Sequence, residues 1–169
     1  MTVEIRKDIE AVTMTADAEF EATPERIWQL WEDPRQLERW WGPPGYPATF
    51  NKHDGLVPGA QIRYYMTTPE GQTPRGWWEV TEVQPPHRLV VKDGFADENG
   101  DPIVHSPETF MIVSIDDIGG GRSRMSILST FTDLEGMEQM LAMGMEEGLK
   151  EAMGQIYGIL AEDKVGTTA

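Results

Sequence analysis

The C-terminal end of the chain carries the pattern that most constrains the fold. After Thr132, apolar side chains recur every three or four residues, which is the spacing of one face of a helix. This stripe consists of Met137, Leu141, Met145, Leu149, Ala152, Ile156 and Ile159. Thr132 and Glu135 have the spacing of a capping box, so we predict one helix from there to about Glu162. A helix of roughly 30 residues spans about 45 Å, so it can lie across a whole small domain.

Glycine and methionine are unusually frequent in this predicted helix. It contains five glycines and half of the ten methionines of the chain. Each glycine costs about 1 kcal/mol relative to alanine inside a helix, so an ordinary amphipathic helix would avoid them. Gly144 and Gly148 lie on or beside the apolar stripe, and methionine fills irregular volumes. Two interpretations remain open: close packing on a sheet, or the wall of a cavity.

The rest of the chain predicts an antiparallel sheet. Thr13–Phe20 alternates apolar and polar residues, and helix starts follow at Thr23-Pro24 and Asp33-Pro34. Six further strands are then expected: Thr49–Asp54, Gln61–Thr67, Gly76–Val83, Arg88–Phe95, Thr109–Asp116 and Arg122–Phe131. Their connections are too short for parallel neighbours. We therefore expect a single α+β domain of residues 1–169, with a core of about 13–162 and flexible tails at 1–11 and 163–169.

Charge and composition exclude several classes of function. The net charge of −15 argues against a nucleic-acid or anionic-membrane partner, because both require a basic patch. The chain has no cysteine, so thiolate and disulfide chemistry are excluded. No apolar stretch has the length of a signal peptide core or a membrane span, and we expect a cytoplasmic protein. The three histidines lie on separate segments, so no metal site is predicted.

The acidic segment Asp97–Glu108 has some features of a calcium loop. Asp97, Asn99, Asp101 and Glu108 occupy ligand positions one, three, five and twelve. The sixth position requires glycine but holds Pro102, and no helices are predicted on either side. We interpret the segment as an acidic hairpin loop.

Several motifs resemble one known superfamily. They are Phe20–Trp28, Trp31–Pro34, Leu37–Gly42, the strand–Pro-Pro–strand segment Gly76–Leu89, and the glycine turn Gly119–Gly121. Together with the order of elements, they resemble the START/SRPBCC superfamily of birch-pollen-allergen-like proteins. Within it, the closest resemblance is to homologues of the activator of the heat-shock-protein-90 ATPase. The resemblance covers about residues 13–162.

The resemblance implies a helix-grip fold. In this fold a curved antiparallel sheet of about seven strands carries two short helices after the first strand, and a long C-terminal helix lies across it. Many members of the superfamily hold an internal cavity, which favours an internal pocket here.

Strand alternation and the helix stripe identify the side chains that would line such a pocket. The candidates are Trp41, Ile62, Tyr64, Met66, Trp78, Val80, Leu89, Val91, Met111, Val113, Met125, Ile127, Leu141, Gly144, Met145 and Gly148. The same residues could instead fill the core. His53 is kept as a polar pocket group, against the alternative of a structural histidine.

The sequence leads to three functional hypotheses. The first is binding of a small, mainly apolar molecule between sheet and helix. The second is a small-molecule enzyme, because some relatives of the fold act as polyketide cyclases or aromatases. The third is a protein-interaction domain, by analogy with the chaperone activator and its role in the stress response, although no particular protein partner is indicated. No catalytic residue, cofactor or metal is predicted.

Overall fold

The computed structural model describes residues 2–166, and the side chains of residues 2–164. It is an α+β structure with one eight-stranded antiparallel sheet in the order β1-β2-β8-β7-β6-β5-β4-β3. The strands are β1 (Glu4–Asp8), β2 (Thr13–Phe20), β3 (Ala48–His53), β4 (Gln61–Met66), β5 (Arg75–Gln84), β6 (Arg88–Ala96), β7 (Glu108–Gly119) and β8 (Arg122–Phe131). The helices are α1 (Pro24–Glu32), α2 (Pro34–Leu37), α3 (Leu134–Ala142) and α4 (Met145–Gly166).

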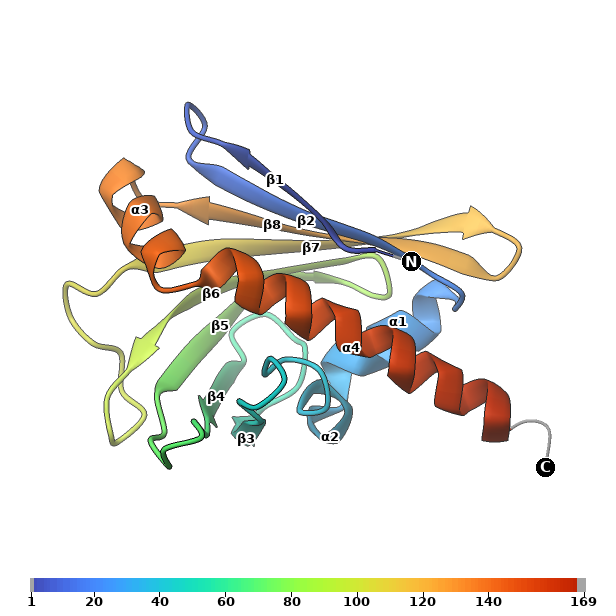
Figure 1. The fold of residues 1–169 in the computed structure, drawn as a ribbon, viewed down its shortest axis with the longest axis horizontal. Helices are drawn as coiled ribbons and strands as arrows, with labels where there is room; N and C mark the ends of the chain where they lie inside the picture. Colours follow the sequence, from blue (N-terminus) through green and yellow to red (C-terminus); the bar gives the residue numbers. More distant parts are fainter. Residues whose placement is uncertain (1, 167–169) are drawn as a thin grey trace.

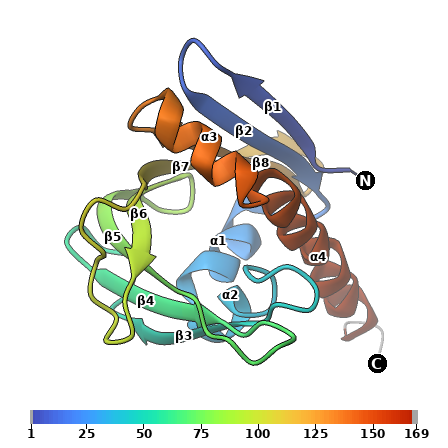
Figure 2. The same ribbon diagram turned by 60° about the vertical axis from the view of Figure 1, so that its left-hand side comes forward.

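The sheet curves around the two short helices. Figure 2 shows α1 and α2 within the curve, and α4 along its open side. Strand alternation explains which residues face inward: in β2, Met14, Ala16, Ala18 and Phe20 are all buried, and the residues between them are only partly so. The predicted helix-grip fold, with its curved sheet and its C-terminal helix across it, is confirmed.

The eighth strand comes from a segment for which the sequence predicts a tail. β1 pairs with β2 along its whole length, from Glu4 opposite Asp17 to Asp8 opposite Thr13. Ile5 packs against the core, and Arg6 Nη2 lies 2.7 Å from Asp17 Oδ2. The prediction of a flexible tail is wrong for this strand, because pairing satisfies the backbone groups along the free edge of β2. At the other end α4 continues to Gly166, and the predicted tails at residue 1 and residues 167–169 lie outside the described residues.

The C-terminal helix is divided in two, where the sequence pattern predicts one continuous helix (Figure 1). Gly144 lies between α3 and α4 with φ of +87°, a conformation that glycine adopts without steric cost. The N-cap of α3 is Asp133, whose Oδ1 accepts a hydrogen bond from the Gly136 N–H at 2.7 Å. Thr132 does not cap the helix; its hydroxyl donates to the Glu108 carbonyl. Periodicity alone could not reveal the break, because the apolar stripe continues through it.

Aromatic rings fill the centre of the core. α2 ends at Leu37, so Trp40 and Trp41 lie in the turn that follows. The ring centroids of Trp31 and Trp40 are 4.8 Å apart, and those of Trp41 and Trp78 are 4.9 Å apart. Phe50 extends this cluster to β3. The edge-to-face contacts of these rings add to the free energy of apolar burial.

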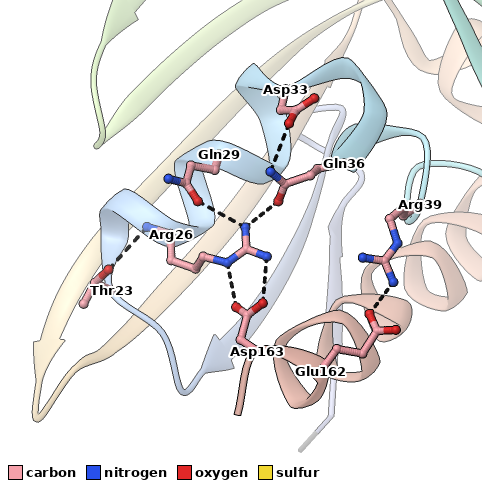
Figure 3. Close-up of polar contacts among 8 residues, drawn as sticks. All are labelled: Thr23, Arg26, Gln29, Asp33, Gln36, Arg39, Glu162 and Asp163. Atoms are coloured by element: carbon pink, nitrogen blue, oxygen red, sulfur yellow. Dashed lines mark hydrogen bonds and ion pairs between the residues drawn. The ribbon is translucent and has the colours of Figure 1, made fainter. Parts of the chain in front are cut away.

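Polar side chains hold the second half of α4 to the two short helices (Figure 3). Arg26 binds Asp163 with two hydrogen bonds, Nε to Oδ2 at 2.7 Å and Nη2 to Oδ1 at 3.2 Å. Arg39 pairs with Glu162 in the same region. The Gln155 amide donates to the carbonyl oxygens that follow α2, those of residues 40 and 42. Within residues 2–166, no helix combines the length and apolar character needed to cross a membrane.

Candidate functional site

A small cavity lies between α3 and strands β4 to β7. Its volume is about 130 Å³. Tyr64 and Met66 of β4, Gly76 of β5, Asp93 of β6, Thr109 of β7 and Met140 of α3 all border it. The wall is mostly apolar, with a few polar groups at fixed positions, which is the usual character of a small-molecule site.

Strand alternation directs the polar groups toward this cavity. Asp93 follows Leu89 and Val91 at two-residue steps along β6, so its side chain lies on the inner face of the sheet. It lies opposite Trp78 on β5 and Thr109 on β7. Tyr64 lies opposite Gly76 on β5. Strands β4, β6 and β7 thus bring the polar side chains of Tyr64, Asp93 and Thr109 to one place.

Gly76 makes room for the ring of Tyr64. A Cβ atom at Gly76 would lie 2.5 Å from Cζ of Tyr64 and 2.6 Å from its hydroxyl oxygen. These distances are far below a normal contact, so any larger residue would displace the ring. The glycine therefore fixes where the Tyr64 hydroxyl lies at the cavity.

Burial changes the acid–base properties of the two ionisable groups. Burial raises the pKa of Asp93 to about 7, because removal from water penalises the carboxylate. Thr109 Oγ1 donates to Asp93 Oδ2 at 3.4 Å, which only partly opposes that effect. Asp93 is half-buried by accessible surface, and we attribute the surface it retains to the cavity that it borders. Burial also raises the pKa of Tyr64, and the charge of Asp93 adds to the increase.

Two indole N–H groups beside Tyr64 make no hydrogen bond of normal geometry within the part of the chain that the structure describes. Nε1 of Trp41 and Nε1 of Trp78 are both buried, and neither makes a hydrogen bond of normal geometry with any described residue. Both indoles are nevertheless close enough to favour the ionised form of Tyr64. The Tyr64 ring centroid lies 6.4 Å from that of Trp41 and 5.6 Å from that of Trp78. Such orphan donors are rare in protein interiors and costly.

An open groove adjoins the cavity. It has a volume of about 600 Å³ and shares Pro74, Arg75, Phe95 and Pro107 with the cavity wall. Its other apolar residues include Ile103 of the β6–β7 loop and Met143 at the end of α3. Met143 is 60% exposed, which is high for a large apolar side chain. The groove is open to solvent and lies next to the cavity, beside α3.

The sequence-based pocket candidates fall into three groups. Tyr64 and Met66 border the cavity, and Trp41 and Trp78 contact Tyr64. The largest group lies in the packed core and is at most 3% exposed: Ile62, Val80, Leu89, Val91, Met111, Val113, Met125 and Ile127. A third group lies on the C-terminal helices, away from the cavity wall: Leu141, Gly144, Met145 and Gly148.

The four residues on the C-terminal helices lie against other parts of the protein. Leu141 and Met145 pack on a separate small cluster around Phe131 and Met137. A Cβ added at Gly144 would meet nothing within 4 Å, and one at Gly148 would make an ordinary contact with Pro43. None of these four residues borders the cavity, although Met140, which does, packs against the same small cluster.

His53 makes structural contacts. Its Nε2 lies 3.2 Å from the Trp31 carbonyl oxygen, and its Nδ1 accepts from the Gly55 N–H at 3.2 Å. Both ring nitrogens are thus engaged with backbone at the end of β3, and the residue does not border the cavity.

Sequence reasoning missed several residues of the cavity. Asp93 and Thr109 lie at alternate positions with buried apolar residues on their strands, and this alternation predicts that their polar side chains face inward. Gly76 begins a predicted strand without any sign that Tyr64 lies against it. Met140 lies off the apolar stripe used to choose helix residues.

The other clusters of charge lie at the surface. On the outer face of β2 and β8, Glu19 pairs with Arg122 and Arg124. In the β6–β7 loop, Asp97 Oδ1 accepts the N–H groups of Asn99 and Asp101. Over the part of the chain that the structure describes, no three acidic or histidine side chains are grouped as a metal site would require.

Comparison with known proteins identifies the family. Residues 21–161 match the family described as activator of Hsp90 ATPase homolog 1-like protein. A protein from Arthrobacter aurescens, known from a solution NMR structure, is 47% identical over 96% of this chain and 93% of its own, with a TM-score of 0.90. A protein from Mycobacterium smegmatis, known from a crystal structure, is 39% identical over 95% of this chain and 97% of its own, with a TM-score of 0.86. Among curated proteins, none matches the chain. The chain therefore belongs to the family of activator of Hsp90 ATPase homolog 1-like proteins.

Proposed function

We propose that this protein binds a small, mainly apolar molecule, about one ring in size, in the cavity between α3 and strands β4 to β7. The observation that carries the proposal is the cavity itself, about 130 Å³ with a mostly apolar wall. An apolar cavity of about 150 Å³ is known to take up benzene, so this one suits a single ring. Removal of apolar ligand surface from water supplies the driving force.

The groove beside α3 supports the same proposal. A ligand must reach the cavity, and the groove shares four residues with its wall. A longer ligand would extend its tail over Ile103 and Met143. Both are large apolar side chains that are exposed in the free protein.

Ethylbenzene is a suitable first probe because it carries one ring and no polar atom. We expect it to raise the melting temperature and to shift the backbone amide signals of β4, β6 and α3 in NMR spectra. Met140→Trp should fill the cavity and abolish both effects. Ile118→Phe adds a ring at the exposed far end of β7 and should leave them intact. The proposal fails if saturating ethylbenzene leaves the melting temperature and these signals of the wild type unchanged.

A second candidate function is a small-molecule enzyme of the polyketide cyclase or aromatase kind. The observation that favours it is the pair of Asp93 and Tyr64 at one apolar cavity. A carboxyl group with a pKa of about 7 can exchange protons at neutral pH. Such an enzyme should speed the exchange of α-protons of a bound ketone into D2O, followed by NMR. No difference in that rate between the wild type and Asp93→Asn would exclude the enzymatic role.

A further inference from the structure

Two polar residues border the cavity from strands on either side of β5, Tyr64 on β4 and Asp93 on β6. We propose that the ligand carries a carbonyl or equivalent acceptor oxygen, which accepts hydrogen bonds from the Tyr64 hydroxyl and from the Asp93 carboxyl. This inference rests on the proposed binding function and specifies the ligand class.

The indoles of Trp41 and Trp78 leave the Tyr64 hydroxyl proton free for the ligand. A tyrosine hydroxyl has one proton to donate and lone pairs that accept. Both indole N–H groups are donors only, both lie near enough to Tyr64 to favour its ionised form, and neither Trp41 nor Trp78 borders the cavity. A donor beside the hydroxyl can meet only the lone pairs of its oxygen. The proton is left to point into the cavity, and Trp41 and Trp78 act as positioning residues.

Asp93 supplies the second donor. Because burial raises its pKa to about 7, a large share of the carboxyl is protonated at neutral pH. Thr109 already donates to Asp93 Oδ2, so the acid proton is directed elsewhere. A tyrosine together with a protonated aspartate in an apolar site is a known way to hold an oxygen that carries partial negative charge. A ligand without an acceptor oxygen would offer no hydrogen-bond acceptor to the protons of the Tyr64 hydroxyl and the Asp93 carboxyl.

The cavity is also small enough for one oxygen to reach both donors. Tyr64, Gly76, Asp93 and Thr109 come from four adjacent strands and border the same 130 Å³. Gly76 admits the Tyr64 ring over β5, next to the strand that carries Asp93. A ring that fills the space would place a carbonyl substituent among these groups.

Two probes of nearly equal shape test the inference. Acetophenone carries a carbonyl where ethylbenzene carries a methylene group. Tyr64→Phe should weaken acetophenone binding about tenfold and change ethylbenzene affinity less than about twofold, measured by NMR titration. Asp93→Leu should act in the same direction. Tyr65→Phe is the matched control, because the Tyr65 ring faces away from Tyr64 and lies under the Arg75 guanidinium at 4.8 Å.

The infrared carbonyl band of bound acetophenone gives a readout in the wild type itself. A hydrogen-bonded carbonyl absorbs at lower frequency than the same ketone in an apolar solvent, and Tyr64→Phe should move the band back toward that value. If ethylbenzene does not bind the wild type, the proposed function is wrong. If both probes bind but the band is unshifted, or Tyr64→Phe weakens both equally, the inference is overturned while the binding function stands.

Discussion

α3 and the second half of α4 belong to one C-terminal segment, but the protein holds them in different ways. In α4, five residues from Ala152 to Leu160 are buried, and all of them but Ala152 belong to the main core. The Arg26–Asp163 pair and the Gln155 amide add polar contacts there. α3 has a single fully buried side chain, Met137, and it belongs to a small separate cluster. The cavity lies at the weakly held end, which is where binding sites and moving elements generally occur.

The same contrast exists inside the sheet. Around Trp31, aromatic rings pack closely and the Trp40 indole donates to the Leu30 carbonyl at 3.0 Å. Around Tyr64, two indole N–H groups make no hydrogen bond of normal geometry with any described residue, and a carboxyl group is removed from water. Each of these features lowers stability. Sites at which a fold departs from good packing are candidates for function, so the contrast itself points to the cavity.

The largest effect expected from this contrast is on stability. Ile156→Ala removes a fully buried side chain of α4 and should lower the free energy of unfolding by about 2–5 kcal/mol. Met140→Ala truncates a half-buried side chain of α3 and should cost about 1 kcal/mol or less. Urea denaturation gives both values. Glu151→Ala, at an exposed position of α4, is the control and should change stability by about 0.5 kcal/mol at most. Equal decreases in the free energy of unfolding for Ile156→Ala and Met140→Ala would mean that packing stabilises α3 as strongly as α4.

A smaller effect should appear in the pH dependence of stability. The pKa of Asp93 is raised in the folded protein from 3.8 to about 7, so between these values the folded state binds more protons than the unfolded state. The free energy of unfolding contributed by Asp93 must therefore fall as pH rises through this window. At about 1.4 kcal/mol per pKa unit, the loss is a few kcal/mol at most.

Asp93→Asn isolates this contribution, because asparagine does not titrate. Relative to the wild type, Asp93→Asn should gain stability as the pH is raised from 4 to 8 in urea denaturation experiments. Glu98→Gln makes the same change of charge in the exposed β6–β7 loop and serves as the control. A constant difference between wild type and Asp93→Asn over the whole pH range would show that Asp93 is not held in an apolar site.

Local patterns predicted the sheet well, because period-two alternation depends only on neighbours in the sequence. The bounds Thr13–Phe20 and Arg122–Phe131 agree with β2 and β8 at both ends. The register of these strands also follows, since each has one buried face. β1 was missed because Glu4–Asp8 is polar and partly exposed, so its pairing with β2 leaves no apolar pattern.

The cavity could not be predicted in the same way, because packing depends on volumes that meet only in three dimensions. Strand parity placed Tyr64 and Leu89 on the same inner face, yet only Tyr64 borders empty space. The inward orientation of the Asp93 side chain could be predicted, because Asp93 lies two and four residues after Val91 and Leu89. A polar residue near the end of a predicted strand is usually exposed, however. Its significance depends on Thr109 and Met140, which no local pattern connects to it.

The smallest predicted effect concerns two glycines of the C-terminal segment that look alike in the sequence. Gly144 has φ of +87° between α3 and α4, whereas Gly154 lies within α4 on an exposed face. An added Cβ would meet nothing within 4 Å at either position, so only the backbone conformation distinguishes them. Gly154→Ala should therefore stabilise the protein by about 0.5–1 kcal/mol through helix propensity. Gly144→Ala should destabilise it by about 1 kcal/mol through left-handed strain.

Urea denaturation midpoints show whether each substitution raises or lowers the stability of the protein. Ligand binding shows whether the cavity depends on the break between α3 and α4. Gly144→Ala should also shift α3 and with it Met140, so ethylbenzene affinity should fall, while Gly154→Ala leaves that affinity unchanged. A stabilising effect of both substitutions would mean that α3 and α4 readily join into one helix. The cavity would then not depend on the division at Gly144, and the difference between the two ends of the segment would come from burial alone.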